Sequence, residues 1–310
     1  MHAPHHRPPI AGSFTGRANN KINNGDRKHP LTTDNYTHDT AAEYARRMDT
    51  TLDRKWAALQ PHVTPGARIL DYGCGMPSEN GIRQRVEAAG GVYECHDISN
   101  TVETAMRERG ATFHTKKDLH EHGAGRYDVV FLSSVLHEFT SQGDCGFEEI
   151  EATWKLVAKG GVAIVRDWTG VRFQLHSQPP RSLKATSTGA MREILTWVGA
   201  LTMNGVIRIG NVNNYKIDWN NLELHADPAS LYEIAFHSVW GPGSLPRESG
   251  EHYGEAQSDL SAHIRYWGDC TVEQQYDEWD ETYLTHLQRL YDIDRLPWPT
   301  KTVLILRRIK

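Results

Sequence analysis

Short apolar runs alternate with polar stretches of helical periodicity through the middle of the chain. The apolar runs are residues 68–71, 92–96, 111–115, 127–134 and 162–165. Short β-branched runs bounded by turn residues predict buried strands, and the stretches between them predict helices over 81–89, 99–109 and 147–157. An amphipathic helix is also expected over 40–60, ahead of the first strand. Strands that alternate with helices in this way indicate a doubly wound α/β sheet.

A long stretch, 169–298, separates the fifth predicted strand from a last apolar run at 302–306. This is far more chain than a simple crossover needs, so it predicts a large α+β insertion after the fifth strand. The elements expected in it are a helix over 190–201, a hairpin of 206–209 with 215–224 around the Asn-rich turn 211–214, a helix over 227–240, and a sixth strand with a helix in 271–290.

The first predicted strand ends in a glycine turn, Asp71-Tyr72-Gly73-Cys74-Gly75. In an α/β sheet this position, at the carboxyl end of a strand, is a binding crevice. The dinucleotide fingerprint requires a third glycine at position 78, where this chain has Ser78. The Asp71 carboxylate would repel phosphate but could accept a hydrogen bond from an ammonium group. A tight turn in some other α/β protein remains the alternative at this point.

Three further patterns follow the glycine turn along the chain. They are D-V-V-F-x-x-x-V-L-H-E over 128–138, L-x-x-x-G-G-x-x-x-x-x-D over 156–167, and the apolar run 302–306. With the D-x-G-x-G turn, they resemble the class I S-adenosylmethionine-dependent methyltransferases. The resemblance implies a Rossmann-like seven-stranded sheet whose last strand is antiparallel. It implies a core of 36–168 plus 299–310 that binds S-adenosylmethionine, with 169–298 as an insertion or substrate-lid subdomain.

The expected cofactor residues follow from this resemblance and from spacing. Asp97 ends the second predicted strand about 20 positions past the glycines, where an acidic residue binds ribose hydroxyls. Asp118, beyond the third strand, is expected to accept from the adenine amino group, and Tyr44 to fold over the cofactor or simply to pack. The full set is Tyr44, Asp71, Gly73, Cys74, Gly75, Asp97, Ile98, Asp118 and Ser133.

Candidate acceptor-side residues follow the fourth and fifth strands and lie in the Gly/Pro-framed segment 240–254. His137 is expected to act as a base if the acceptor arrives protonated, or else to cap a helix. The segment 240–254 is expected to be a substrate lid, with a simple loop tip as the alternative. The expected catalytic residues are His137, Asp167, Glu248 and Tyr253, and the expected substrate-binding residues are Glu138, Arg166, Arg247 and Glu251.

The composition of the chain limits the classes of function that it can have. The chain is 38% hydrophobic and 24% charged with a net charge of −5, and it lacks an apolar run long enough for a membrane span. Four scattered cysteines fit a reduced, cytoplasmic setting, and no metal site is expected. Residues 1–35 are basic and poor in apolar side chains, so we expect a disordered arm whose removal leaves the melting temperature unchanged.

Methyl transfer to an O or N nucleophile of a small molecule or peptide is therefore the favoured function. An RNA, DNA or nucleotide methyltransferase that uses the basic arm is the alternative, although the acidic body of the chain speaks against it. A non-catalytic module that binds S-adenosylmethionine is a third hypothesis. Neither the acceptor atom nor the oligomeric state follows from the sequence.

Overall fold

The structure is a computed structural model that describes residues 50–141, 144–169, 181–207, 215–254 and 269–310. The chain divides into two compact units, 1–32 and 33–310, and every described residue belongs to the second. The predicted basic arm and Tyr44 lie outside the described residues. Among the helices described, none combines the length and the apolar character that crossing a membrane requires.

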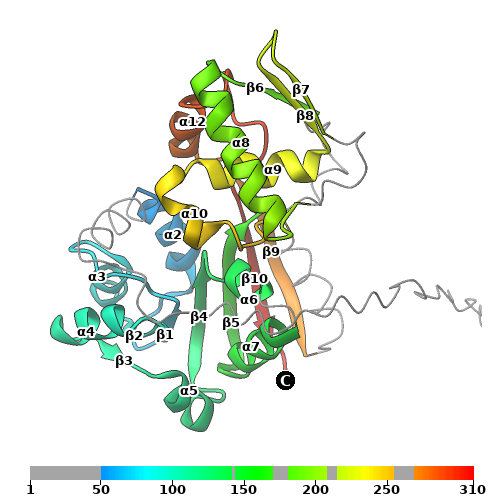
Figure 1. Cartoon of the computed structure of the whole chain (residues 1–310). Helices are drawn as coiled ribbons and strands as arrows, with labels where there is room; N and C mark the ends of the chain where they lie inside the picture. The colour runs from blue at the N-terminus through cyan, green and yellow to red at the C-terminus, as the bar shows by residue number, and fades with distance from the viewer. Residues whose placement is uncertain (1–49, 142–143, 170–180, 208–214, 255–268) are drawn as a thin grey trace, which may run out of the picture. The chain divides into compact units, whose positions relative to one another are not determined.

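A seven-stranded sheet forms the core, in the order β3-β2-β1-β4-β5-β10-β9 (Figure 1). The first five strands are parallel, and β10 is antiparallel to both of its neighbours. The strands are β1 Arg68–Tyr72, β2 Val92–His96, β3 Thr112–Phe113, β4 Tyr127–Ser133, β5 Val157–Trp168, β9 Cys270–Glu278 and β10 Lys301–Arg308. This order confirms the predicted Rossmann-like sheet, including its antiparallel last strand.

Helices cover both faces of this sheet. They are α2 Leu52–Leu59, the short 3-10 helix η1 Gln60–His62, α3 Ile82–Ala88, α4 Asn100–Glu108, α5 Lys116–His122, α6 Leu136–Thr140 and α7 Asp144–Lys155. Successive β4 side chains alternate between two apolar clusters, as a strand with two buried faces requires. Val129 and Phe131 join the cluster of α2, α3 and α4, whereas Val130 and Leu132 join that of α5, α6 and α7. The sheet is therefore doubly wound.

Two details of the core were not predicted. Strand β5 begins at Val157, earlier than the predicted 162–165, so the Gly160-Gly161 pair lies inside it, where the pairing with β4 is irregular. A Cβ on Gly161 would lie 2.8 Å from the carbonyl oxygen of Asp128, so the bulge needs a glycine. Helix α5 fills a stretch for which no element was predicted, and a reciprocal capping box between Thr115 and Asp118 starts it.

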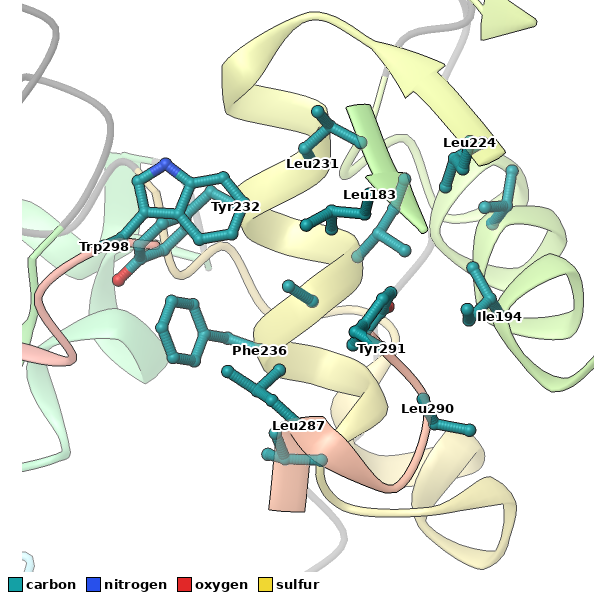
Figure 2. Close-up of a cluster of buried hydrophobic side chains, with 14 of the residues drawn as sticks. Leu183, Ile194, Leu224, Leu231, Tyr232, Phe236, Leu287, Leu290, Tyr291 and Trp298 are labelled. Carbon is teal, nitrogen blue, oxygen red and sulfur yellow. The ribbon is translucent and has the colours of Figure 1, made fainter. Parts of the chain in front are cut away.

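The insertion after β5 contains helices and a small antiparallel sheet in the order β6-β8-β7. Its elements are β6 Ser182–Lys184, α8 Thr188–Met203, β7 Tyr215–Asp218, β8 Glu223–Ala226, α9 Pro228–Ser238, the 3-10 helix η3 Pro242–Ser244 and α10 Leu245–Glu248. Helix α9 is buried continuously from Leu231 to Ser238. Figure 2 shows why: side chains from β6, β8 and α8 lie on one side of it, and Trp298 and Leu287 on the other.

One predicted strand of the insertion is divided. The stretch 215–224 turns at 219–222, where the Asp218 carboxylate accepts from the backbone N–H groups of Asn220 and Asn221, whereas the predicted turn 211–214 lies outside the described residues. The sixth strand and the helix expected in 271–290 are β9 and α12, and β9 pairs with β10 in the core sheet. Helix α12, Glu281–Gln288, nevertheless packs on the insertion's apolar cluster through Tyr283 and Leu287.

Candidate functional site

The glycine turn leaves β1 through two residues in the left-handed region. Gly73 has φ 75° and Gly75 has φ 65°, a conformation that L side chains rarely adopt. A Cβ on Gly73 would lie 2.7 Å from Val135 Cγ2, whereas a Cβ on Gly75 would meet no atom of the described residues within 4 Å. Gly73 is thus required by packing inside the protein. Gly75 instead faces open space, as the cradle of a ligand would.

Asp97 closes this turn from the end of β2. Its Oδ2 accepts from the backbone N–H of Gly75 at 2.9 Å, and its Oδ1 accepts from the N–H of Ser99 at 2.9 Å. Burial raises the pKa of its carboxyl above the ordinary value, although the two backbone donors oppose that shift. The next residue, Ile98, leaves 46% of its surface exposed. An acidic group and an apolar surface therefore stand side by side at the edge of the turn.

Asp71 lies one step further inside, at the end of β1. Its side chain is buried, and Oδ2 accepts from the hydroxyl of Tyr93 at 2.9 Å. Burial raises the pKa of this carboxyl to about 6, which the Tyr93 hydrogen bond partly offsets. A cation brought to the turn would favour the ionised carboxylate.

The end of β4 adds two serines. Ser133 is buried, and its hydroxyl lacks a hydrogen-bond partner among the described residues. Ser134 has φ 63°, a strained value for a residue with a side chain, and its backbone N–H donates to the carbonyl of Arg166 at 2.7 Å. A strained backbone conformation persists only where the surrounding structure enforces it, and such residues are common at functional sites. Here it turns the chain sharply into α6, which carries His137.

His137 is held by Asp167 at the end of β5. The ring Nδ1 lies 2.8 Å from Asp167 Oδ1, and the backbone N–H of His137 donates to Asp167 Oδ2 at 3.2 Å. Burial alone would lower the pKa of this imidazole, but Asp167 and Glu251 raise it well above the ordinary value. Its other nitrogen, Nε2, lies 3.3 Å from Glu251 Oε2. With a carboxylate beside each ring nitrogen, the charged form of His137 is favoured, which makes this imidazole a poor base.

Two more carboxylates gather at Nε2. The ligand atoms of His137, Glu138 and Glu251 all lie within 4.8 Å of one another. Burial raises the pKa of Glu251 to about 8, and the nearby Glu248 carboxylate adds to that shift. Burial also raises the pKa of Glu138, to about 7. We name this group, His137 with Glu138 and Glu251, the acceptor-side triad.

The segment 240–254 lies at this same edge of the sheet. The backbone N–H of His252 donates to the Ser141 hydroxyl at 2.8 Å, and the ring of Tyr253 stacks on Trp168 with centroids 4.5 Å apart. The segment is not an open loop, because η3 and α10 organise it. Its position agrees with the substrate-lid hypothesis, which stays a prediction.

Tyr253 is enclosed on every side. Its ring lies between those of Trp168 and His237, its hydroxyl donates to Glu248, and it accepts from Trp240 Nε1 at 2.9 Å. Burial raises the pKa of this phenol well above its usual value. The geometry therefore favours a positioning role for Tyr253 over the catalytic role predicted from sequence.

Other predicted residues are placed less favourably. Arg166 is fully buried, and its guanidinium pairs with the Glu278 carboxylate of β9 at 2.7 Å. Its charge is therefore already balanced by a residue outside the triad. Asp118 is exposed, and its carboxylate is engaged in the capping box of α5. The side chain of Arg247 and the whole of Tyr44 lie outside the described residues. The substrate role of Arg166 and the adenine role of Asp118 gain no support from this geometry.

Sequence reasoning missed Lys301, at the start of β10. Its side chain is 2% exposed, its Nζ lies 3.8 Å from Asp167 Oδ1 and 3.6 Å from the centroid of the Trp168 ring. Burial lowers the pKa of this amine to about 7, although Asp167 opposes that shift. In the sequence, Lys301 is visible simply as a lysine at the start of an apolar run. The antiparallel register of β10 with β5, which the sequence does not show, brings it to Asp167.

Comparisons with known proteins give similarities of fold. No protein-family model matches the chain, and no curated protein matches it. A SAM-dependent methyltransferase from Methanosarcina mazei is 11% identical over 81% of this chain and 96% of its own, with a TM-score of 0.44. One from Archaeoglobus fulgidus is 13% identical over 88% and 100%, with a TM-score of 0.43.

A third structure, from Rhodobacter sphaeroides and described provisionally as a Zn-dependent alcohol dehydrogenase, is 13% identical over 83% of this chain and 89% of its own, with a TM-score of 0.45. The strand order itself is that of a Rossmann-like doubly wound sheet, with β10 antiparallel between β5 and β9. The fold is therefore established by topology, and the activity has to be inferred from the residues of the site.

Proposed function

We propose that the chain is an S-adenosylmethionine-dependent methyltransferase that transfers a methyl group to an O or N nucleophile of a small-molecule or peptide acceptor. The observation that carries the proposal is one convergence at the carboxyl edge of the parallel strands. Asp71, Gly75 and Asp97 form the glycine turn and its surroundings there. His137 and Glu138 of the acceptor-side triad follow β4, and the segment after α10 brings Glu251 to them. Cofactor and acceptor residues thus meet at a single edge of the sheet.

The cofactor's groups fit the residues present. The open space beyond Gly75 admits a ligand against bare backbone, and Asp97 can exchange its Gly75 bond for ribose hydroxyls. Asp71 would balance a cationic ammonium, and exposed Ile98 would cover an adenine face. When bound, S-adenosylmethionine supplies an activated methyl group on a sulfonium, and the protein's part is to align it with the acceptor.

The acceptor side belongs to α6 and to the segment 240–254. Asp167 fixes the His137 ring, so Nε2 and the Glu251 carboxylate face the same point. A hydroxyl acceptor must lose its proton, and Glu251 with its pKa near 8 is better poised to receive it than the imidazolium of His137. The surplus of carboxylates at this edge, Glu138 and Glu248 among them, would repel a phosphate backbone. A small or peptide acceptor is therefore favoured over a nucleic acid.

Calorimetric titration of the full chain tests the proposal. S-adenosylmethionine and its demethylated product should both bind, and NAD should not, because Ser78 replaces the third glycine that a pyrophosphate requires. Binding of NAD without either methionine cofactor would refute the proposal. Methyl transfer itself is then sought with labelled cofactor and a panel of hydroxyl and amine acceptors.

A further inference from the structure

We propose that the acceptor-side triad binds a divalent transition-metal cation through His137 Nε2 and the carboxylates of Glu138 and Glu251. The ligand atoms of these three side chains lie within 4.8 Å of one another, close enough to share one ion. One nitrogen and two carboxylate oxygens suit Mn²⁺, Fe²⁺ or Zn²⁺ better than the all-oxygen cations Mg²⁺ and Ca²⁺. The inference goes beyond methyl transfer and does not depend on it.

The orientation of His137 is the first independent support. Asp167 lies 2.8 Å from Nδ1 and also accepts from the backbone N–H of His137, so the ring is fixed with Nε2 toward the two glutamates. Histidines that bind metals in proteins nearly always donate their other ring N–H to a carboxylate or carbonyl in this manner. The Nζ of Lys301 in turn lies 3.8 Å from Asp167 Oδ1. The orienting carboxylate is therefore itself held in place.

The situation of Glu138 is the second support. This carboxylate makes neither a hydrogen bond nor an ion pair with another described residue, although Asp97, Glu248 and Asp167 are near enough to act on it electrostatically. Like charges crowded around a carboxylate are unfavourable unless a cation joins them, and Nε2 of His137 lies on the same side as Glu251 Oε2, at 3.3 Å.

The triad also joins two parts of the fold. His137 and Glu138 belong to α6, whereas Glu251 follows α10 in the insertion, and Tyr253 secures that segment by stacking on Trp168. A cation here would link the lid segment to the sheet. Three protein ligands leave coordination positions open, as in catalytic metal sites. An acceptor with one or two oxygen donors, such as a vicinal diol or an enediol, is the class that such an ion would hold beside the methyl group.

The test uses the full chain after treatment with a chelator, and Mn²⁺ is the probe. Titration followed by electron paramagnetic resonance should show free Mn²⁺ disappearing with one tight site per chain. Glu138→Gln and Glu251→Gln should weaken that site by at least about 10-fold, and Asp167→Asn by about 10–100-fold through loss of the ring's orientation. Zn²⁺ should displace the Mn²⁺, whereas Mg²⁺ at the same concentration should not.

Glu138→Gln is the decisive variant, because its carboxylate has no hydrogen bond to lose and the folded protein should remain intact. Glu273→Gln, on β9 and paired with Arg307, is the matched control and should bind Mn²⁺ like the unaltered chain. The histidines at positions 2, 5 and 6 add a weak background that every variant shares.

Equal Mn²⁺ affinity in Glu138→Gln, Glu251→Gln and the Glu273→Gln control would overturn the proposal, as would a complete lack of tight binding. Binding of the demethylated cofactor is measured on the same samples. A chain that binds this cofactor but not Mn²⁺ or Zn²⁺ refutes the metal site alone. A chain that binds the metal but not the cofactor refutes methyl transfer alone.

Discussion

The carboxylate of Asp97 accepts a hydrogen bond from the backbone N–H of Gly75, at 2.9 Å and across 22 positions of sequence. This bond joins the end of β2 to the glycine turn after β1. The acid expected to bind ribose is thus also an acceptor for the backbone of the turn. A sugar diol has to share or replace a bond that holds the turn in shape, so cofactor affinity and turn geometry are linked through one side chain.

Asp97→Ala should therefore weaken binding of the demethylated cofactor by about 1–3 kcal/mol, through loss of charge-assisted hydrogen bonds to the ribose. Calorimetry measures the change. Asp118→Ala is the control, since Asp118 caps α5 on the surface and should affect binding little. Equal losses in the two variants would restore the adenine role of Asp118 that the sequence predicted.

The two turn glycines should respond differently to substitution. Gly75→Val should abolish cofactor binding while the protein stays folded, because its side chain would enter open space beside the turn. Gly73→Ala should lower stability instead, since its Cβ would lie 2.7 Å from Val135 Cγ2. Each also carries roughly 1–2 kcal/mol of strain from its positive φ. Thermal unfolding and cofactor titration on both variants separate the effects, and identical behaviour would contradict the assignment.

Tyr253→Phe should reduce the free energy of unfolding by about 1–3 kcal/mol, because its hydroxyl bonds to Glu248 and Trp240 in a buried setting. Cofactor affinity should be unchanged, since the ring of Tyr253 contacts those of His137 and Trp168 and the phenol is not part of the glycine turn. Tyr276→Phe on the exposed face of β9 is the control and should leave stability unaltered. Methyl transfer that disappears without any loss of stability would instead support a chemical role for the phenol.

Stability of the metal-free protein should fall as pH rises from about 4.5, the unfolded pKa of the two glutamates, to about 8, the higher of their folded values. The pKa of Glu251 is raised to about 8 and that of Glu138 to about 7, both from 4.5. A group with a raised pKa in the folded state contributes stability that is complete below its unfolded pKa and is lost as pH climbs through the folded one. His137, whose pKa is also raised, contributes with the same sign. Urea unfolding across this range measures the trend, and Glu251→Gln should flatten it.

Much of the site was predictable because its residues end strands. Asp71, Asp97, His137 and Asp167 each follow a buried run, and the carboxyl ends of parallel strands meet at one edge. The sequence also contained the capping signal Thr115-x-x-Asp118, but Asp118 was assigned to adenine and the signal was overlooked. Competing explanations for one residue, rather than missing information, caused that error.

Other features depended on pairings that sequence cannot show. Arg166 and Asp167 are adjacent, but successive side chains of a strand point to opposite faces. Asp167 therefore meets His137, while Arg166 meets Glu278 two strands away. Lys301 approaches Asp167 only because β10 runs antiparallel beside β5. Periodicity indicates that a residue is buried but not which neighbour it has.

The position of β10 also determines how this sheet can assemble. Strand β10 lies between β5 and β9 in the sheet, and Thr169 bonds to Thr302 across 133 positions of sequence. Such distant pairing makes refolding slow, because a long loop must close before the contact is gained. Until β10 inserts, β5 and β9 both present unpaired edges that can recruit other chains. Aggregation during refolding, rather than low stability of the finished fold, is the failure to expect from this topology.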